Sequence, residues 1–291
     1  MNINTTEKQI KDIVQEQFKI LLTNIEKDFS KNYKKKWYNF LLMPLSDDII
    51  AHMVFVSSFE SKSGNAIETC AKRIAELRYG KENVPSIVNP RKLNNNLNPN
   101  EIKGQIIVTD VDIEDGELKG KISEFRACNE GSGSGKNKTK SKVNQIKISE
   151  LLSISDNFKK NGMLYQKPVD LAFYDGTDWN LIEIKAGGNL DSSNAPSNIE
   201  KLFTIYAGLH VENAKVYFAT LYNKDGEGNE WNSSVKKHMS YPEMFLIGSE
   251  FWNKILPEEI DFLKFTEIYK TALVELKLDA RMHNLINKAK K

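Results

Sequence analysis

Two acidic residues and a lysine are spaced in this chain so that their side chains could bind a metal ion together. Residues 168–185 read PVDLAFYDGTDWNLIEIK, in which two β-rich stretches flank an Asp-Gly turn of the kind found in hairpins. With the turn centred just after Gly176, Asp170 and Glu183 lie equally far from the centre and face each other across the hairpin. Lys185 shares the face of Glu183 because side chains alternate along a strand. The spacing therefore predicts two carboxylates and one ammonium group in the same place.

Such a group of side chains has a definite chemical use. Two neighbouring carboxylates offer the hard oxygen ligands that Mg²⁺ prefers. The metal can polarise a phosphate, lower the pKa of a bound water and stabilise the leaving oxygen. A nearby lysine can orient the water or stabilise developing negative charge. The alternative is a hairpin whose charges lie on a solvated face, and residue spacing alone leaves both interpretations open.

The segments after the hairpin indicate which elements position it. A break in the pattern at 186–189 (AGGN) precedes a segment that opens around Pro196, and proline is favoured in the first turn of a helix. Apolar residues then recur at helical spacing up to Leu209, and residues 214–221 (AKVYFATL) are typical of a short buried strand. A hairpin, a helix and a strand in this order predict a βαβ arrangement with a right-handed crossover.

These motifs resemble a known class of nucleases. A proline two residues before Asp170, followed by Glu183-x-Lys185, resembles the signature of the PD-(D/E)XK superfamily, which includes most type II restriction endonucleases. Segments 187–191 (GGNLD) and 245–252 (FLIGSEFW) are similar to the TdeIII-type group of these enzymes. The resemblance implies an α/β fold with a restriction-endonuclease-like central mixed sheet flanked by helices, and with helical elaborations at both termini.

The implied domain organisation is a single restriction-endonuclease-like domain over residues 1–291. Within it we expect a helical N-terminal region at 1–55, a catalytic core at 56–225 and a C-terminal helical region at 226–291.

The resemblance also implies roles for individual residues. The catalytic residues would be Asp170, Glu183, Lys185 and Glu68, and the metal ligands would be Asp170, Glu183, Ile184 and Glu68. Glu68 falls in the first turn of a helix predicted over residues 65–79, where a carboxylate is also stabilised by the helix dipole. Glu60 is the alternative source of the additional glutamate.

The implied activity is Mg²⁺-dependent cleavage of duplex DNA at a short palindromic site. A two-fold site calls for a two-fold protein, so the resemblance also implies a homodimer, with a cognate DNA methyltransferase protecting the host. The apolar candidates for the dimer contact are a helical stripe on residues 6–29 and the Phe251-Trp252 region. Two other functions are compatible with the hairpin: a repair or recombination nuclease of the same superfamily, and a non-catalytic DNA-binding protein.

Nucleic-acid affinity must come from local patches, because the formal net charge is only +2. We expect DNA contacts from the residues that follow: Lys34, Lys35, Lys36, Lys136, Lys138, Lys140, Lys142 and Asn189. The first three lysines follow the 6–29 stripe among aromatic residues, and a solvated helix end is the alternative there. The other four lysines lie in the Gly- and Ser-rich segment 131–142, which could equally be a plain linker.

The composition excludes several other classes. The chain has no run of eighteen apolar residues and no apolar segment near its N-terminus, which argues against a membrane span and a secretory signal. Its two cysteines are too few for a disulfide framework or a zinc site. We therefore expect a cytoplasmic protein.

Overall fold

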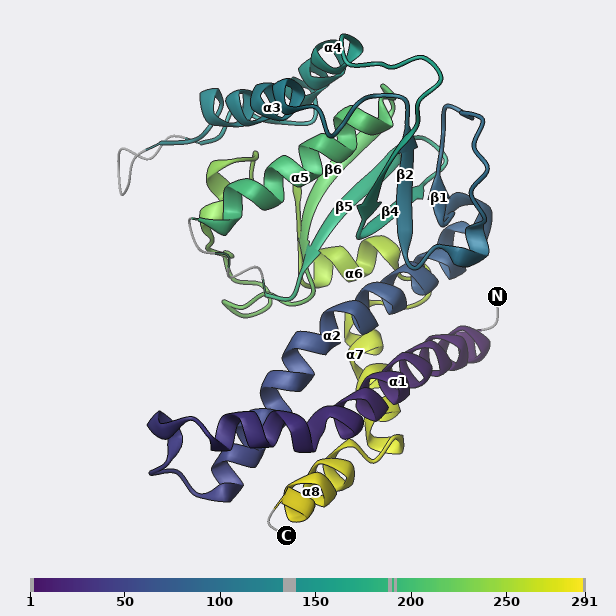
Figure 1. The fold of residues 1–291 in the computed structure, drawn as a ribbon. Helices are drawn as coiled ribbons and strands as arrows, with labels where there is room; N and C mark the ends of the chain where they lie inside the picture. Colours follow the sequence, from purple (N-terminus) through teal and green to yellow (C-terminus); the bar gives the residue numbers. More distant parts are fainter. Residues whose placement is uncertain (1–2, 133–139, 188–189, 191–192, 290–291) are drawn as a thin grey trace. The chain divides into compact units, whose positions relative to one another are not determined.

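The computed structural model describes residues 3–132, 140–187, 190 and 193–289. The chain divides into two compact units (Figure 1): Met1–Ile74 with Leu256–Lys291, and Ala75–Ile255. The boundary falls inside one long helix, so the units do not follow the three regions expected from the sequence. The expectation of a single domain stays a prediction.

The first unit is helical in its described residues. It contains α1 (Ile3–Trp37), a 3₁₀ turn at Phe40–Leu42, most of α2 (Asp47–Tyr79), α7 (Phe262–Glu275) and α8 (Leu278–Ala289). The apolar stripe of α1 is buried inside this unit, where Phe18 is fully buried and packs edge-on against Tyr269 of α7 at 5.3 Å. The stripe is therefore intramolecular core, and its proposed part in a dimer contact was wrong.

The second unit holds all the strands of the described chain. Its helices are α3 (Gly116–Cys128), α4 (Glu150–Asp156), α5 (Asn194–Leu209) and α6 (Ser249–Ile255), with 3₁₀ turns at Lys81–Asn83, Pro99–Glu101, Lys147–Ser149 and Ser234–Lys237. Its strands are β1 (Ile87–Val88), β2 (Gln105–Thr109), β3 (Tyr165–Val169), β4 (Leu171–Tyr174), β5 (Trp179–Lys185), β6 (Ala214–Thr220) and β7 (Phe245–Ile247). Because β7 lies within 226–291, that region is not purely helical as predicted. Phe251 and Trp252 are buried on α6, which removes them as a dimer surface.

The strands confirm an α/β fold with mixed pairing and flanking helices, although they form two sheets instead of one. β1 runs parallel to β2 and β3 antiparallel to it, in the order β1-β2-β3. The second sheet has the order β4-β5-β6-β7, with an antiparallel β4-β5 hairpin and parallel β5-β6 and β6-β7 pairs. The predicted crossover helix is α5, which joins β5 to β6 and lies over them in Figure 1.

One extended run of chain passes from the first sheet to the second. β3 ends at Val169 and β4 begins at Leu171, so Asp170 alone separates them. Beside this point the buried Gln105 acts as a side-chain strand partner: its Oε1 accepts the N–H of Ala172 at 2.9 Å, and its Nε2 donates to the carbonyl of Ala172 at 2.7 Å. The amide thereby satisfies backbone groups that would otherwise be buried without partners where the strand changes sheets.

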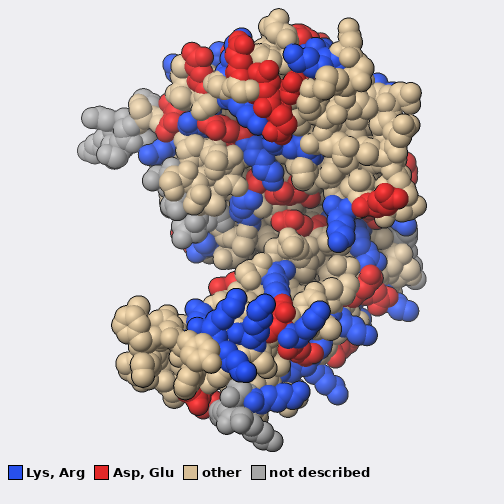
Figure 2. Space-filling view, in the orientation of Figure 1, with Lys and Arg blue, Asp and Glu red and all other residues tan. Residues whose placement is uncertain are grey.

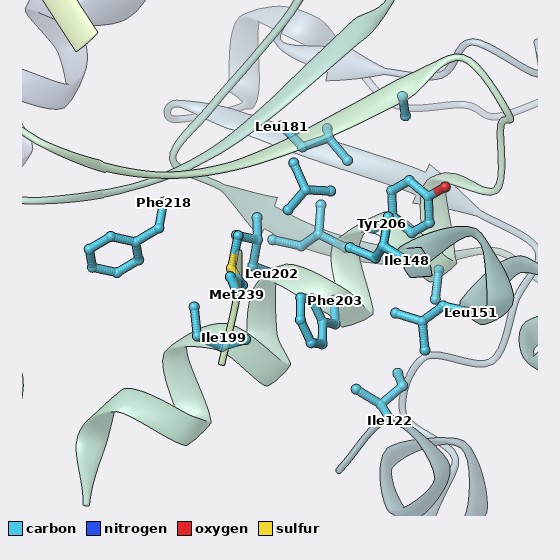
Figure 3. Packing of buried hydrophobic residues seen from close by; sticks show 14 of the residues in the cluster. Ile122, Ile148, Leu151, Leu181, Ile199, Leu202, Phe203, Tyr206, Phe218 and Met239 are labelled. Atoms are coloured by element: carbon cyan, nitrogen blue, oxygen red, sulfur yellow. The ribbon is translucent and has the colours of Figure 1, made fainter. Parts of the chain in front are cut away.

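The main apolar cluster of the second unit lies between α5 and the sheet (Figure 3). Ile199, Leu202 and Phe203 of α5 are fully buried, and Phe203 meets Phe125 of α3 edge-on at 5.8 Å. Leu181 of β5 belongs to the same cluster. Because residues two apart on a strand share a face, Glu183 must also lie beneath α5.

Among the residues that the structure describes, no helix is long and apolar enough to cross a membrane.

Candidate active site

The hairpin register is the one that the sequence predicts. Leu171 pairs with Ile182 and Tyr174 with Trp179, and extending this ladder by one step places Asp170 opposite Glu183. The turn is held by Asp175, whose Oδ1 accepts the N–H groups of both Thr177 and Asp178. Gly176 takes a φ of 96°, a left-handed conformation that glycine adopts without strain.

Asp170 is fixed by the strand opposite it. The backbone N–H of Ile184 donates to Asp170 Oδ2 at 2.9 Å, and the side chain is 13% exposed. The carboxylate is therefore held at the point where the chain leaves one sheet for the other, with its Oδ1 turned to other partners.

Glu183 and Lys185 lie on the same face of β5, as their alternation predicts. The Lys185 Nζ contacts Glu183 Oε1 at 2.5 Å and lies 3.9 Å from Asp170 Oδ2. Glu183 is only 1% exposed, so its charge is buried beneath α5 and is not on a solvated hairpin face. The structure thus brings the three predicted residues together, while their catalytic roles stay predictions.

A second lysine, which the sequence reasoning missed, completes this group of charges. Lys201 of α5 places its Nζ 2.9 Å from Asp170 Oδ1 and 2.7 Å from Glu183 Oε2. The Glu183 Oε2 contact is an ion pair without the alignment of a hydrogen bond. The available signal was the position of Lys201 between the buried Ile199 and Leu202, on the helix that crosses over the sheet.

Burial and neighbouring charges perturb two of these groups. Burial raises the pKa of Glu183 above its usual value, and the charge of Asp170 raises it further, against the opposing influence of Lys185 and Lys201. For Lys201, burial lowers the pKa, but the carboxylates of Glu183 and Asp170 more than offset this and raise the pKa above its usual value. The ammonium of Lys201 is therefore stabilised in its charged form.

The oxygen donors here fit a hard divalent cation. Asp170 and Glu183 supply converging carboxylates, and Ile184 can contribute only a main-chain carbonyl because its side chain is apolar. The described residues contain no cluster of three or more acidic, histidine or cysteine ligands. Mg²⁺ is commonly held through one or two carboxylates, with waters and substrate phosphates completing its octahedron. The residues present therefore fit Mg²⁺ better than a metal that needs a complete protein cage.

The two glutamates proposed as a further ligand lie on α2. This helix begins at Asp47, so Glu68 is in its interior and not in a first turn, and the helix-dipole explanation for that residue was wrong. Glu60 is exposed on the same helix. Both belong to the first unit and the carboxylate pair to the second, so a part for either glutamate in the site stays a prediction.

The predicted DNA-contact lysines have different environments. Lys34, Lys35 and Lys36 lie in the last turn of α1. This helix ends at Trp37, beyond the apolar stripe expected over residues 6–29. Lys35 and Lys36 line a pocket of about 450 Å³ together with Asn32, Asn39, Val54, Ser57, Ser58 and Ser61. Figure 2 shows many Lys and Arg side chains over the first unit.

Lys140 and Lys142 are exposed, and the remaining candidates (Lys136, Lys138 and Asn189) lie outside the described residues.

Comparison with known proteins identifies the family of this chain. Searches among curated proteins and among solved structures gave no significant match. Residues 6–272 match the family described as type II restriction endonuclease, HinfI, which confirms the type II restriction endonuclease expected from the sequence. The finer resemblance to the TdeIII-type group stays a prediction. The match covers nearly the whole chain, so the protein belongs to the HinfI family of type II restriction endonucleases, DNA-binding enzymes that cleave DNA at specific sites.

Proposed function

We propose that this endonuclease hydrolyses the phosphodiester bonds of duplex DNA at a short palindromic site, using Mg²⁺ held by Asp170, Glu183 and the carbonyl of Ile184. The observation that carries the proposal is the convergence of two carboxylates from opposite strands at a buried position with two ammonium groups. Such a cluster is costly to bury and would be replaced by apolar residues if only stability mattered.

Each residue has a distinct task in this proposal. When bound, the metal polarises the phosphate and stabilises developing negative charge. The N–H of Ile184 orients Asp170, and β5 fixes Glu183 directly opposite. Lys185 lies beside the pair and is 29% exposed, so its ammonium can orient the attacking water or stabilise negative charge on the phosphate.

DNA binding would draw on lysines outside this site. The lysines of α1 and the pocket they line offer ammonium, amide and hydroxyl groups, which are the usual partners of phosphate oxygens. Lys136, Lys138, Lys140, Lys142 and Asn189 belong to the same proposal, and Glu68 stays the candidate for an additional metal ligand.

The proposed assembly is a homodimer. A palindromic duplex has one scissile phosphate on each strand, and two copies related by a two-fold axis would present one carboxylate pair to each. Exposed apolar side chains remain at the end of α1, where Trp37 is 53% exposed, and in the α1–α2 connection (residues 38–46), where Phe40 is 72% and Met43 75% exposed. We take this connection as the surface that a second copy covers. The enzyme would act in the cytoplasm beside a cognate methyltransferase.

Cleavage assays with different metals test the proposal. Phage DNA incubated with the protein and Mg²⁺ should give discrete fragments. Ca²⁺ should support binding without cleavage, because it accepts the same oxygen ligands but is larger and activates water less well. Discrete fragments in the presence of excess EDTA would contradict the metal mechanism.

A further inference from the structure

Two lysines closely contact three of the four carboxylate oxygens of Asp170 and Glu183, and a backbone N–H contacts the fourth. Lys201 bridges the pair, because its Nζ contacts Asp170 Oδ1 at 2.9 Å and Glu183 Oε2 at 2.7 Å. Lys185 has its close contact with Glu183 Oε1 alone, at 2.5 Å, and Asp170 Oδ2 is taken by the N–H of Ile184. The cation that joins one oxygen of each carboxylate is therefore Lys201.

The Lys201 ammonium compensates the charge of the two carboxylates and occupies the space between them, as a bound metal ion would. Two carboxylates this close and this buried repel each other unless positive charge lies between them. A metal bound by one oxygen from each carboxylate needs metal–oxygen distances of roughly 2.0–2.6 Å. An ammonium held at hydrogen-bond distance from the same two oxygens leaves no room for such an ion, so the two occupants exclude each other.

The backbone of Lys201 is fixed, but its side chain can move away from the carboxylates. Its helix is fixed by the fully buried Ile199, Leu202 and Phe203, so the backbone at 201 has little freedom. The side chain itself is 32% exposed and has a flexible four-carbon stem. Rotation about its own bonds can move the ammonium toward solvent while α5 stays in place.

We propose that Lys201 is an exchangeable counter-ion, which bridges Asp170 and Glu183 in the metal-free enzyme and is displaced when the divalent metal binds. The inference rests on the proposed metal-dependent function. It explains how two buried carboxylates stay aligned without metal. It also links metal binding to DNA binding through the net charge of the site. Two carboxylates with two ammonium groups are neutral, whereas two carboxylates with a divalent metal and Lys185 carry a net positive charge that attracts the DNA phosphate.

Calcium binding to the DNA-free protein, measured by calorimetry, tests the exchange. Lys201→Met removes the competing charge and keeps the length of the side chain, so we expect Ca²⁺ to bind at least about tenfold more tightly. Lys201→Arg keeps a bridging cation and should stay near wild type. Lys215→Met is the matched control, because Lys215 pairs at 2.6 Å with Asp178 in the same unit, away from the carboxylate pair.

The Lys185→Met variant distinguishes displacement of Lys201 by the metal from the general gain in Ca²⁺ affinity that follows the loss of any nearby positive charge. Removing any nearby ammonium strengthens metal binding somewhat, so the proposal requires a clearly larger gain for Lys201→Met than for Lys185→Met. Equal gains, or unchanged or weaker Ca²⁺ binding in a folded Lys201→Met protein, would overturn it. If Lys201→Met is unfolded without metal, circular dichroism during Ca²⁺ addition decides: refolding supports the proposal and continued disorder contradicts it.

The same titrations distinguish this inference from the proposed function. If wild type binds no Ca²⁺, or Asp170→Asn binds it as well as wild type, the metal site itself is wrong. If wild type binds Ca²⁺ and Asp170→Asn does not, but Lys201→Met gives no gain, only the exchange fails.

Discussion

The carboxylate site of the second unit and the C-terminal end of α1 in the first unit place charge in opposite environments. Glu183 is 1% exposed and lies against two ammonium groups, each at 2.7 Å or less. Lys34 and Lys35, in the last turn of α1, are exposed to solvent beside exposed apolar side chains. The buried carboxylate site depends on every one of its charged partners being present. The exposed lysines of α1 can have an effect only through their summed charge.

The energetic scales of these environments differ accordingly. Removing one partner of a buried ion pair costs about 3–5 kcal/mol, because the other charge stays buried without compensation. An exposed pair contributes about 0–1 kcal/mol and is screened by salt. Single substitutions should therefore have large effects in the carboxylate site, and only grouped substitutions should have measurable effects at the lysines.

The largest effect is expected for Asp170→Asn and Glu183→Gln. Either change removes a metal-binding carboxylate, and a loss of several kcal/mol of transition-state stabilisation corresponds to several orders of magnitude in rate. Single-turnover cleavage of duplex DNA in Mg²⁺ measures it, with Lys215→Met as the control that should cut normally. A folded Asp170→Asn enzyme that cuts within tenfold of wild type would remove the distinction between the two regions.

Local sequence signals were sufficient for three of the four charged residues of this site, Asp170, Glu183 and Lys185. An Asp-Gly turn and the alternation of side chains fix the β4-β5 register, so the position of Asp170 opposite Glu183 follows from a short segment. Lys201 could not be placed in this way. Its position over the carboxylates depends on how α5 is rotated over the sheet, which is decided by packing against β5, α3 and α4 and not by spacing along the helix.

Long-range partners also explain the features of the fold that were missed. The first hairpin strand expected from residues 168–174 is divided between two sheets at Asp170, where the distant Gln105 pairs with the backbone of Ala172. The apolar stripe of α1 showed that one face is covered but not that α7 of the same chain contributes to covering it. The end of α1 was placed too early because Lys34, Lys35 and Lys36 interrupt the apolar period while still favouring helix.

The next largest effect is expected at the apolar side chains of the α1–α2 connection. Phe40 is 72% exposed, so Phe40→Asp should leave folding unchanged. If a second copy covers this surface, the substitution should weaken dimerisation roughly 30-fold or more, as truncating a central interface residue costs about 2 kcal/mol. Light scattering should give about twice the 33.2 kDa chain mass for wild type and a lower mass for the variant. Equal masses for both proteins would place the dimer interface elsewhere.

A smaller effect, on stability, is expected from a second buried charge group of the second unit. His238 is 3% exposed, and Arg126 lies 3.2 Å from its Nδ1, an arrangement that favours the neutral ring. Burial lowers the pKa of His238, and although Glu130 opposes this, the value stays below the usual one. As the pH falls below the unfolded value of about 6.5, the unfolded chain takes up the proton first, so the free energy of unfolding decreases.

Denaturant unfolding at pH 7 and pH 5 measures this decrease. His238→Gln cannot take up the proton, so its free energy of unfolding should fall less between the two pH values than that of wild type. The comparison is made within each protein, so an unrelated loss of packing in the variant does not enter. Identical decreases in both proteins would mean that His238 is not held neutral by its surroundings.

The smallest effect is expected for the lysines of α1, and it should appear in salt dependence. If Lys34, Lys35 and Lys36 neutralise phosphates, replacing all three with alanine lowers the slope of log affinity against log salt by about 0.9 for each phosphate that is no longer neutralised. Alanine preserves the helix, so folding should not change. DNA binding in Ca²⁺ at several salt concentrations measures the slope, and the triple arginine variant, which keeps all three charges, is the control. A slope that is unchanged by alanine would mean that these lysines only solvate the end of α1, and that other basic residues bind the phosphates.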